Sequence, residues 1–176
     1  MLTLLLILRI IHIGAACYLV GSSLYGYYLL RPSLELIPPA HSVVVAQRVG
    51  TLFTYTGWTA IGLALLTGIL RLYLIGRLWL LFTLELYTHG PGRSLALMIL
   101  CWFVSVVSSS IMTFVLRPRL IRKLLVSSNP TLADVEKRRT TQISAGTWLE
   151  RFQLTNLIAW ALATIFGTSV SFGGIF

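Results

Sequence analysis

Acidic side chains are scarce in this sequence, which has five Asp and Glu residues against 14 Lys and Arg residues in a chain of 176. Charged residues make up only 11% of the chain, well below the roughly 25% of soluble domains. The acids are scattered, so no carboxylate pair is present for general acid–base catalysis, and no glycine-rich phosphate loop occurs. No Asp or Glu lies deep within an apolar stretch, which argues against proton-coupled transport. The sequence therefore predicts no familiar class of soluble enzyme.

Cysteine and histidine, common ligands of transition metals, are also rare. Cys17 and Cys101 both lie in apolar stretches, which argues against a structural disulfide. The histidines, His12, His41 and His89, show no close Cys and His spacing of the zinc-site kind. No basic segment precedes the apolar N-terminus, and that apolar stretch is too long for the core of a signal peptide. We therefore expect a retained first helix.

Long charge-free stretches dominate the sequence instead. There are four, of 21, 22, 23 and 25 residues: 10–30, 49–70, 94–116 and 152–176. At 1.5 Å of rise per residue, roughly 20 helical residues cross a hydrocarbon core of about 30 Å. We predict an all-α polytopic membrane protein with four transmembrane helices at about 4–30, 46–71, 94–116 and 149–173. The helices are expected to form one bundle and one domain over 1–176.

The segments between these stretches predict the connections. Arg31-Pro32 is expected to end the first helix, since proline cannot continue it. The apolar segment 72–92 is interrupted by charges, which favours a short interfacial helix. In the polar segment 117–151, Thr131 is a plausible N-cap, and the helix that follows either runs into the fourth transmembrane helix or breaks at Gly146.

The basic residues predict the orientation in the membrane. Segment 117–151 holds eight Lys and Arg residues, whereas 71–93 holds three. Because cytoplasmic loops carry the excess of positive charge, we expect 117–151 in the cytoplasm and both termini outside, most simply in a bacterial inner membrane. The net charge of +9 flanks apolar helices, which favours anionic lipid headgroups and not nucleic acid as the partner.

One pair of ionisable residues is the sharpest clue to function. Arg9 and His12 are one turn apart on the first predicted helix and therefore share a face. Ionisable groups at such positions usually face a bundle interior, a cavity or a partner. His12 could be an axial ligand of haem b or a copper ligand, and Arg9 could pair with a haem propionate. The bland alternative is that His12 bonds to another helix while Arg9 reaches the headgroups or pairs with Glu85.

Further ligands are harder to find. His89 is the only other histidine expected on the same side of the membrane, so a bis-histidine haem within one chain needs His89 to fold over the bundle. Otherwise the second axial ligand comes from a partner, from Met98 or from water. The third predicted helix also presents Met98, Cys101 and Met112 at helical spacing, and soft sulfur ligands favour Cu(I). Methionine equally fills gaps in apolar cores.

Four short motifs, one in each predicted membrane helix or at its end, resemble those of a known family. The first is Leu8-Arg9-Ile10-Ile11-His12-Ile13, which is followed by Gly21 nine residues after the histidine. The others are Leu66-Thr67-Gly68, Leu116-Arg117-Pro118-Arg119-Leu120 and Leu154-Thr155-Asn156-Leu157. They resemble the copper-resistance-D-like membrane proteins and related uncharacterised four-helix families. The resemblance implies a four-helix bundle with the histidine of the first helix in a site, and copper handling or haem-linked redox chemistry. The four-helix membrane protoporphyrinogen oxidases are more distantly similar.

Two positions depart from that family pattern. Leu19 stands where a tryptophan often follows the histidine by seven residues. Gly92-Arg93-Ser94-Leu95 lacks the lysine that often opens the third helix, which weakens the case for protoporphyrinogen oxidase activity. The histidine remains the main residue that the resemblance transfers.

The sequence therefore predicts a small integral membrane protein that binds haem b, or with less support copper, and acts in electron transport or copper handling. The candidate cofactor-binding residues are His12, Arg9 and His89, and the candidate metal ligands are His12, Met98 and Cys101. The alternative is a non-catalytic structural subunit of a larger respiratory or photosynthetic complex. Its partners would be other membrane subunits or further copies of the chain.

Overall fold

The computed structural model describes residues 1–118 and 132–174. The predicted N-cap at Thr131 lies outside these residues. The described part of the chain contains helices and no strand, and four of its helical stretches are long and apolar enough to cross a membrane. These are Leu2–Leu34, Val44–Leu74, Gly90–Leu116 and Ser144–Ser171, so the prediction of an all-α bundle with four candidate membrane helices is confirmed.

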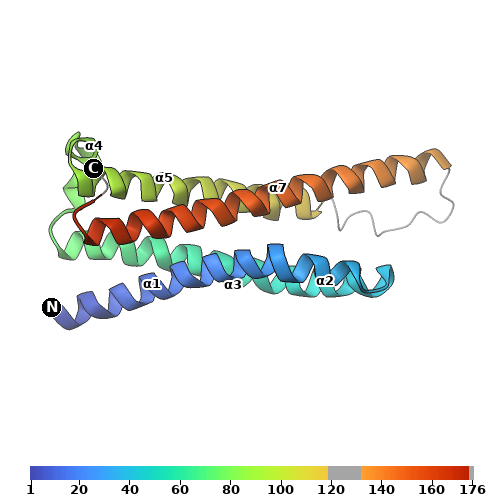
Figure 1. The fold of residues 1–176 in the computed structure, drawn as a ribbon, viewed down its shortest axis with the longest axis horizontal. Coiled ribbons are helices and arrows are strands. Elements are labelled where there is room, and N and C mark those ends of the chain that lie inside the picture. Colours follow the sequence, from blue (N-terminus) through green and yellow to red (C-terminus); the bar gives the residue numbers. More distant parts are fainter. Residues whose placement is uncertain (119–131, 175–176) are drawn as a thin grey trace.

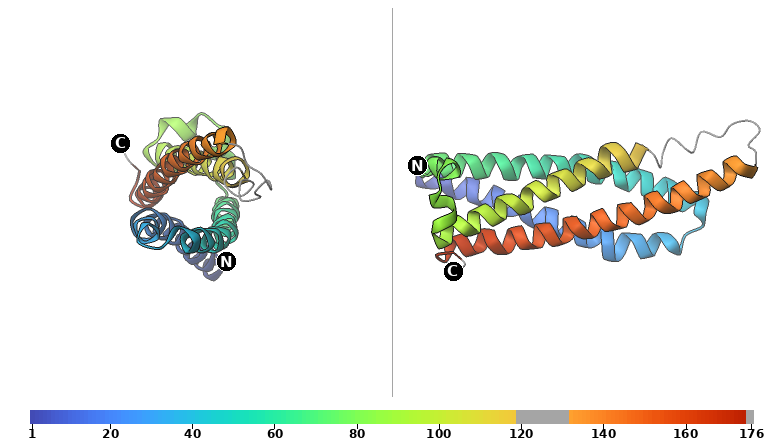
Figure 2. Two further views of the ribbon diagram at one scale, coloured as in Figure 1. Left: turned by 90° about the vertical axis from the view of Figure 1, so that its right-hand side faces the viewer. Right: turned by 90° about the horizontal axis from the view of Figure 1, so that it is seen from above.

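The long helices run alternately up and down in two antiparallel pairs (Figure 1). The first pair is α1 (Leu2–Leu24) with α3 (Pro39–Leu74), and the second is α5 (Gly90–Ser110) with α7 (Leu132–Ser171). α1 also contacts α7, and side chains of α3 reach the end of the third membrane helix, so the four helices surround a common axis (Figure 2). The N-terminus and the end of α7 lie at one end of the bundle, which we call the His12 end; the opposite end is the Arg117 end.

The boundary charges of the four helices lie at these two ends. At the His12 end are Arg9 near the start of α1, Arg71 near the end of α3 and Arg93 near the start of α5. The Arg117 end carries Arg31, Arg48, Arg117 and Arg151. An antiparallel bundle thus brings the charge-free stretches level with one another, as a single hydrocarbon layer requires.

The helix termination expected at Arg31-Pro32 is wrong. The chain instead forms a π-helix at Tyr25–Leu30 and continues as α2 (Arg31–Glu35). A second π-helix, Ile111–Leu116, likewise ends two residues before Pro118. Proline removes an N–H donor, and its ring clashes with the carbonyl four residues back, so a wider turn with i to i−5 bonds relieves both problems. The N–H groups of Arg31 and Arg117 make such bonds, to the carbonyls of Gly26 and Met112.

The connection between α3 and α5 differs in detail from the predicted interfacial helix. It consists of two short pieces, a 3₁₀-helix at Leu78–Phe82 and α4 (Glu85–Thr88). Gly76, with φ of 73°, ends α3 in the left-handed region that glycine tolerates best. Thr83 is extended between the two pieces. This segment folds beside the start of α5 at the His12 end (Figure 2).

The fourth membrane helix is one continuous element. α7 extends over 40 residues and passes Gly146 without a break, which decides between the two predicted alternatives. Gly146 is exposed within it, and no atom of a neighbouring element approaches its Cβ position. α7 begins at Leu132, before the candidate membrane span that starts at Ser144. This first part of the helix projects beyond the partner helices at the Arg117 end (Figure 1).

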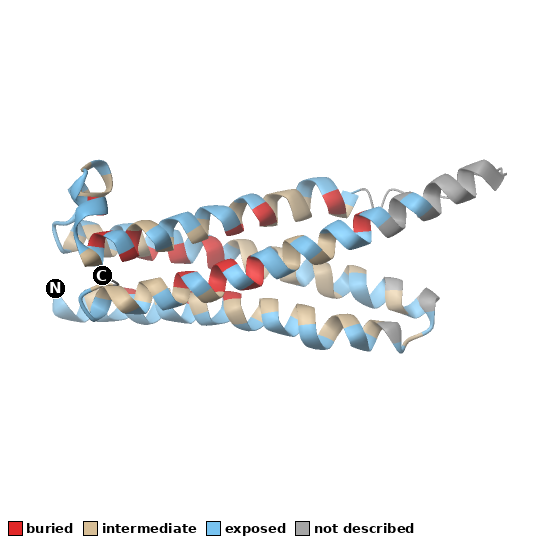
Figure 3. Ribbon diagram, turned by 45° about the horizontal axis from the view of Figure 1, so that its top comes forward, coloured by how far each residue is buried: buried red, intermediate tan, exposed pale blue. Residues whose placement is uncertain are grey.

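The core is a seam of small, aliphatic and aromatic residues between the helix pairs. Leu19, Ala60, Ile61, Trp160 and Ala163 form its buried centre. The outward faces of all four helices expose large apolar side chains, and buried positions lie mainly on the faces turned toward one another (Figure 3). Such exposure is costly in water and favourable in lipid, which supports a membrane location.

Gly92 controls how closely α4 approaches α5. A Cβ atom there would lie 2.8 Å from the Leu86 carbonyl oxygen and 2.9 Å from that of Glu85, distances that force backbone to move. We predict that Gly92→Ala destabilises the protein by about 1–3 kcal/mol, as overpacking does. Gly14→Ala is the matched control, because nothing lies within 4 Å of its Cβ position. Thermal unfolding in detergent, followed by circular dichroism, measures both; equal melting temperatures would contradict the close approach.

Candidate functional site at the His12 end

His12 is half-buried on α1 and is joined to α3 by a hydrogen bond. Its Nδ1 lies 3.0 Å from Thr67 Oγ1. The Thr67 hydroxyl donates its single proton to the Leu63 carbonyl at 2.6 Å, so its oxygen is left to accept from His12. The Ala64 carbonyl, 3.3 Å from the same hydroxyl, is a further acceptor for the ring. These contacts favour the tautomer with the proton on Nδ1, which leaves a lone pair on Nε2.

Gly68 determines which edge of the ring faces α3. A Cβ atom at this position would lie 3.4 Å from His12 Cε1 and 3.8 Å from Nδ1. The Cε1–Nδ1 edge therefore packs against the backbone of α3. Nε2 lies on the remaining part of the ring, away from Thr67.

Arg9 and Arg71 lie one helical turn beyond the contact between His12 and Thr67. Arg9 precedes His12 by three residues on α1, and Arg71 follows Thr67 by four on α3. Because these helices are antiparallel, both steps lead toward the same end of the bundle, by about 4.5 and 6 Å of rise. Arg71 is near enough to interact electrostatically with both His12 and Arg9. The three residues thus form one basic cluster.

The other predicted site residues do not join this cluster. His89 is exposed at the N-cap of α5, and no hydrogen bond or ion pair within the described part of the chain links it to His12. Met98 packs against α7, where its Sδ lies 3.1 Å from the Cβ position of Gly167. Cys101 is half-buried against the hydrophobic core. Over residues 1–118 and 132–174, no group of three or more His, Cys, Asp or Glu residues could hold a metal ion.

Sequence reasoning missed Thr67 and Arg71 as members of the site. Leu66-Thr67-Gly68 is a short apolar motif, and serine and threonine in membrane helices commonly bond to their own backbone, as Thr67 also does. Only the packing of α1 against α3 shows that this hydroxyl faces His12. Of the bland alternative, the bond from His12 to another helix does occur, to Thr67 of α3, whereas an ion pair between Arg9 and Glu85 does not occur among the described residues.

A second polar cluster lies between α5 and α7. Asn156 Nδ2 donates to Ser109 Oγ at 3.0 Å and lies 3.7 Å from Met112 Sδ. In the described part of the chain, three buried polar atoms have no hydrogen-bond partner, namely Asn156 Oδ1, Ser105 Oγ and Trp102 Nε1. Ser108 differs, because its hydroxyl donates to the Phe152 carbonyl at 3.2 Å. The cluster ties α5 to α7 near the middle of the bundle.

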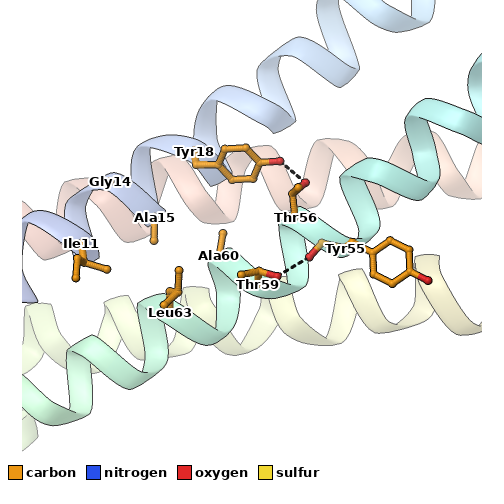
Figure 4. A pocket seen from close by; sticks show the side chains of 9 residues that line it. All are labelled: Ile11, Gly14, Ala15, Tyr18, Tyr55, Thr56, Thr59, Ala60 and Leu63. Carbon is orange, nitrogen blue, oxygen red and sulfur yellow. Dashed lines mark hydrogen bonds between the residues drawn. The ribbon is translucent and has the colours of Figure 1, made fainter.

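A shallow groove runs along the outer face between α1 and α3 (Figure 4). Its volume is about 420 Å³, and one hydrogen bond, from the Tyr18 hydroxyl to Thr56, crosses it. Tyr55 borders the groove and is 73% exposed. No predicted site residue lines this groove, so it is separate from the basic cluster at His12.

Comparison with other proteins adds no further constraint. No protein-family model, curated protein or solved structure matches this chain. The resemblance to the copper-resistance-D-like proteins therefore stays a prediction, and the site has to be argued from its own geometry.

We predict that replacing Ser105 and replacing Ser108 of α5 have opposite effects on stability. Ser105→Ala removes a fully buried hydroxyl without a partner, and we expect a gain of about 1 kcal/mol in the free energy of unfolding. Ser108→Ala removes the bond to Phe152, and we expect a loss of about 1 kcal/mol. Denaturant unfolding in mixed micelles measures both. A loss of stability in Ser105→Ala as large as that in Ser108→Ala would contradict the assignment.

Proposed function

We propose that this protein binds haem b through Nε2 of His12 and acts in membrane electron transport. The observation that carries the proposal is the hydrogen bond between His12 Nδ1 and Thr67. A histidine that ligates a metal typically donates its other ring N–H to an oxygen, which fixes the tautomer and the ring orientation. Thr67 and the Ala64 carbonyl supply such acceptors, and the bond to Thr67 uses Nδ1, so Nε2 is the ring nitrogen left for a ligand.

The donor set fits haem better than a metal ion held by protein alone. A copper or zinc site needs several side-chain ligands, and the described residues contain no such group around His12. Haem supplies four of the iron's ligands itself, so one or two axial residues are sufficient. Copper bound by His12, Met98 and Cys101 has less support, because contacts with Gly167 and the hydrophobic core account for the two sulfur residues.

Thr67, Gly68 and Arg9 each have a role in this proposal. Thr67 holds the imidazole in place, and Gly68 lets the ring approach α3. Arg9, one turn from His12 toward the end of the bundle, would pair with a carboxylate of the bound haem. Haem, when bound, would supply one-electron chemistry.

The structural-subunit alternative has one observation in its favour, the groove between α1 and α3 (Figure 4). Gly14 and Ala15 line the groove on the α1 side, and small residues such as these let a neighbouring membrane helix approach closely. A non-catalytic subunit would use this face to pack against a larger complex. Purification in a mild detergent tests it, since stoichiometric recovery with other membrane subunits, without any cofactor, would favour that role.

Absorption spectroscopy of the protein with added haem tests the main proposal. We expect a Soret band and a reduced-minus-oxidised difference spectrum for the wild type, and loss of both in His12→Ala. Thr67→Val keeps the ligand but removes one of the two hydrogen-bond acceptors, so we expect haem affinity to fall by about tenfold, the lower end of the effect of such partners. His41→Ala is the matched control, because His41 is exposed at the other end of the bundle.

Two results would contradict the proposal. One is a preparation that stays colourless when haem is supplied. The other is a Soret band that survives His12→Ala unchanged while His41→Ala or His89→Ala removes it.

A further inference from the structure

The arginines at the two ends of the bundle differ in how they are paired. At the Arg117 end, Arg31 forms an ion pair with Glu150, and Arg117 donates to Thr51 and to Thr54, the latter at 2.7 Å. Arg151 stacks over the Trp148 ring with its Cζ 5.3 Å from the centroid. Three of the four boundary arginines there thus have polar or aromatic partners.

At the His12 end, Arg9 and Arg71 lack such partners. Neither makes a hydrogen bond or ion pair with any residue in 1–118 or 132–174. The third boundary arginine, Arg93, donates to the Thr88 carbonyl at 3.3 Å. Among the described residues, the acid at this end is Glu85, which is exposed on α4 beside α5. Arg9 and Arg71 therefore lie on the two sides of the α1–α3 contact, near enough for their like charges to interact, and no acid of the described residues forms an ion pair with either.

Two close guanidinium groups at a membrane boundary repel each other unless an anion lies between them. Guanidinium binds the planar or tetrahedral oxygens of carboxylate and phosphate through paired hydrogen bonds. Arg71 is half-buried and Arg9 is exposed, so an anion can reach the pair from the headgroup region. Both arginines lie in the parts of their candidate membrane spans, Leu2–Leu34 and Val44–Leu74, that are nearest the His12 end, and long arginine side chains can reach the headgroups from such positions.

We propose that Arg9 and Arg71 together form a binding site for an oxyanion, a phosphate or carboxylate carried by an amphiphilic molecule at the membrane surface. Two sources share this chemistry. One is the phosphate of an anionic phospholipid. The other, which rests on the proposed function, is a carboxylate of haem bound at His12.

Binding measurements on the detergent-purified full chain test this site. The lipid probe is phosphatidylglycerol, compared with phosphatidylcholine of the same acyl chains. The cofactor probe is haem, compared with its dimethyl ester, which lacks the carboxylate charges. The variants are Arg9→Gln and Arg71→Gln, and the matched control is Arg93→Gln at the same end of the bundle.

We expect tighter binding of at least one anionic probe than of its neutral or zwitterionic counterpart. Arg9→Gln or Arg71→Gln should weaken that binding about tenfold, the effect of losing one charge-assisted hydrogen bond, and Arg93→Gln should leave it unchanged. Selectivity for phosphatidylglycerol alone identifies a lipid site, and selectivity for haem over its ester identifies a cofactor site.

The outcomes separate this inference from the haem proposal. Phosphatidylglycerol binding that depends on both arginines, in a protein that takes up no haem, keeps the oxyanion site and rejects the haem function. Haem binding with wild-type affinity in both glutamine variants keeps the function and rejects the oxyanion site, provided that the lipid probe also shows no dependence on them. Two further results would overturn the oxyanion site. One is a loss of anion binding in Arg93→Gln as large as in the Arg9 and Arg71 variants, and the other is no selectivity for either anionic probe.

Discussion

The thickness of the hydrocarbon layer is the constraint on which the rest of this structure depends. Each membrane helix has its charges at its ends, so an antiparallel bundle brings those ends into two levels. That alignment places residues 9, 12 and 71, which are far apart in the sequence, around one contact. The site at the His12 end is therefore a consequence of chain topology and membrane thickness acting together.

Proline shapes the opposite end of the bundle. Both Arg-Pro pairs follow π-helical segments, which let the helices continue to the boundary without a clash. The second π-helix contains Thr113, which accepts a hydrogen bond from Trp58 at 3.3 Å, and it leads into Arg117, whose guanidinium bonds to α3. These contacts close the bundle between α3 and the third membrane helix. Among the described residues, three arginines at the Arg117 end have polar or aromatic partners, whereas Arg9 and Arg71 at the His12 end have none.

The bundle could be predicted from the sequence because membrane helices leave a strong pattern, a long stretch without charge. The continuation of the helix through Pro32 could not, since a single proline is compatible with a stop, a kink or a widened turn. Among the site residues, Arg9 and His12 were visible because ionisable side chains in an apolar helix stand out. Thr67 and Arg71 were not, because a threonine is ordinary in a membrane helix and an arginine is ordinary at its end. Their role depends on the register between α1 and α3, and the spacing of residues within one helix gives no information about that register.

The central claim is that α3 fixes His12 with its proton on Nδ1 and its Nε2 lone pair free. Nitrogen NMR of protein labelled with ¹⁵N-histidine, at a pH where the ring is neutral, tests this most directly. The account predicts the Nδ1–H tautomer for His12 in the wild type and a shift toward the Nε2–H tautomer in Thr67→Val. A wild-type signal of the Nε2–H form, or a tautomer that Thr67→Val leaves unchanged, would contradict it.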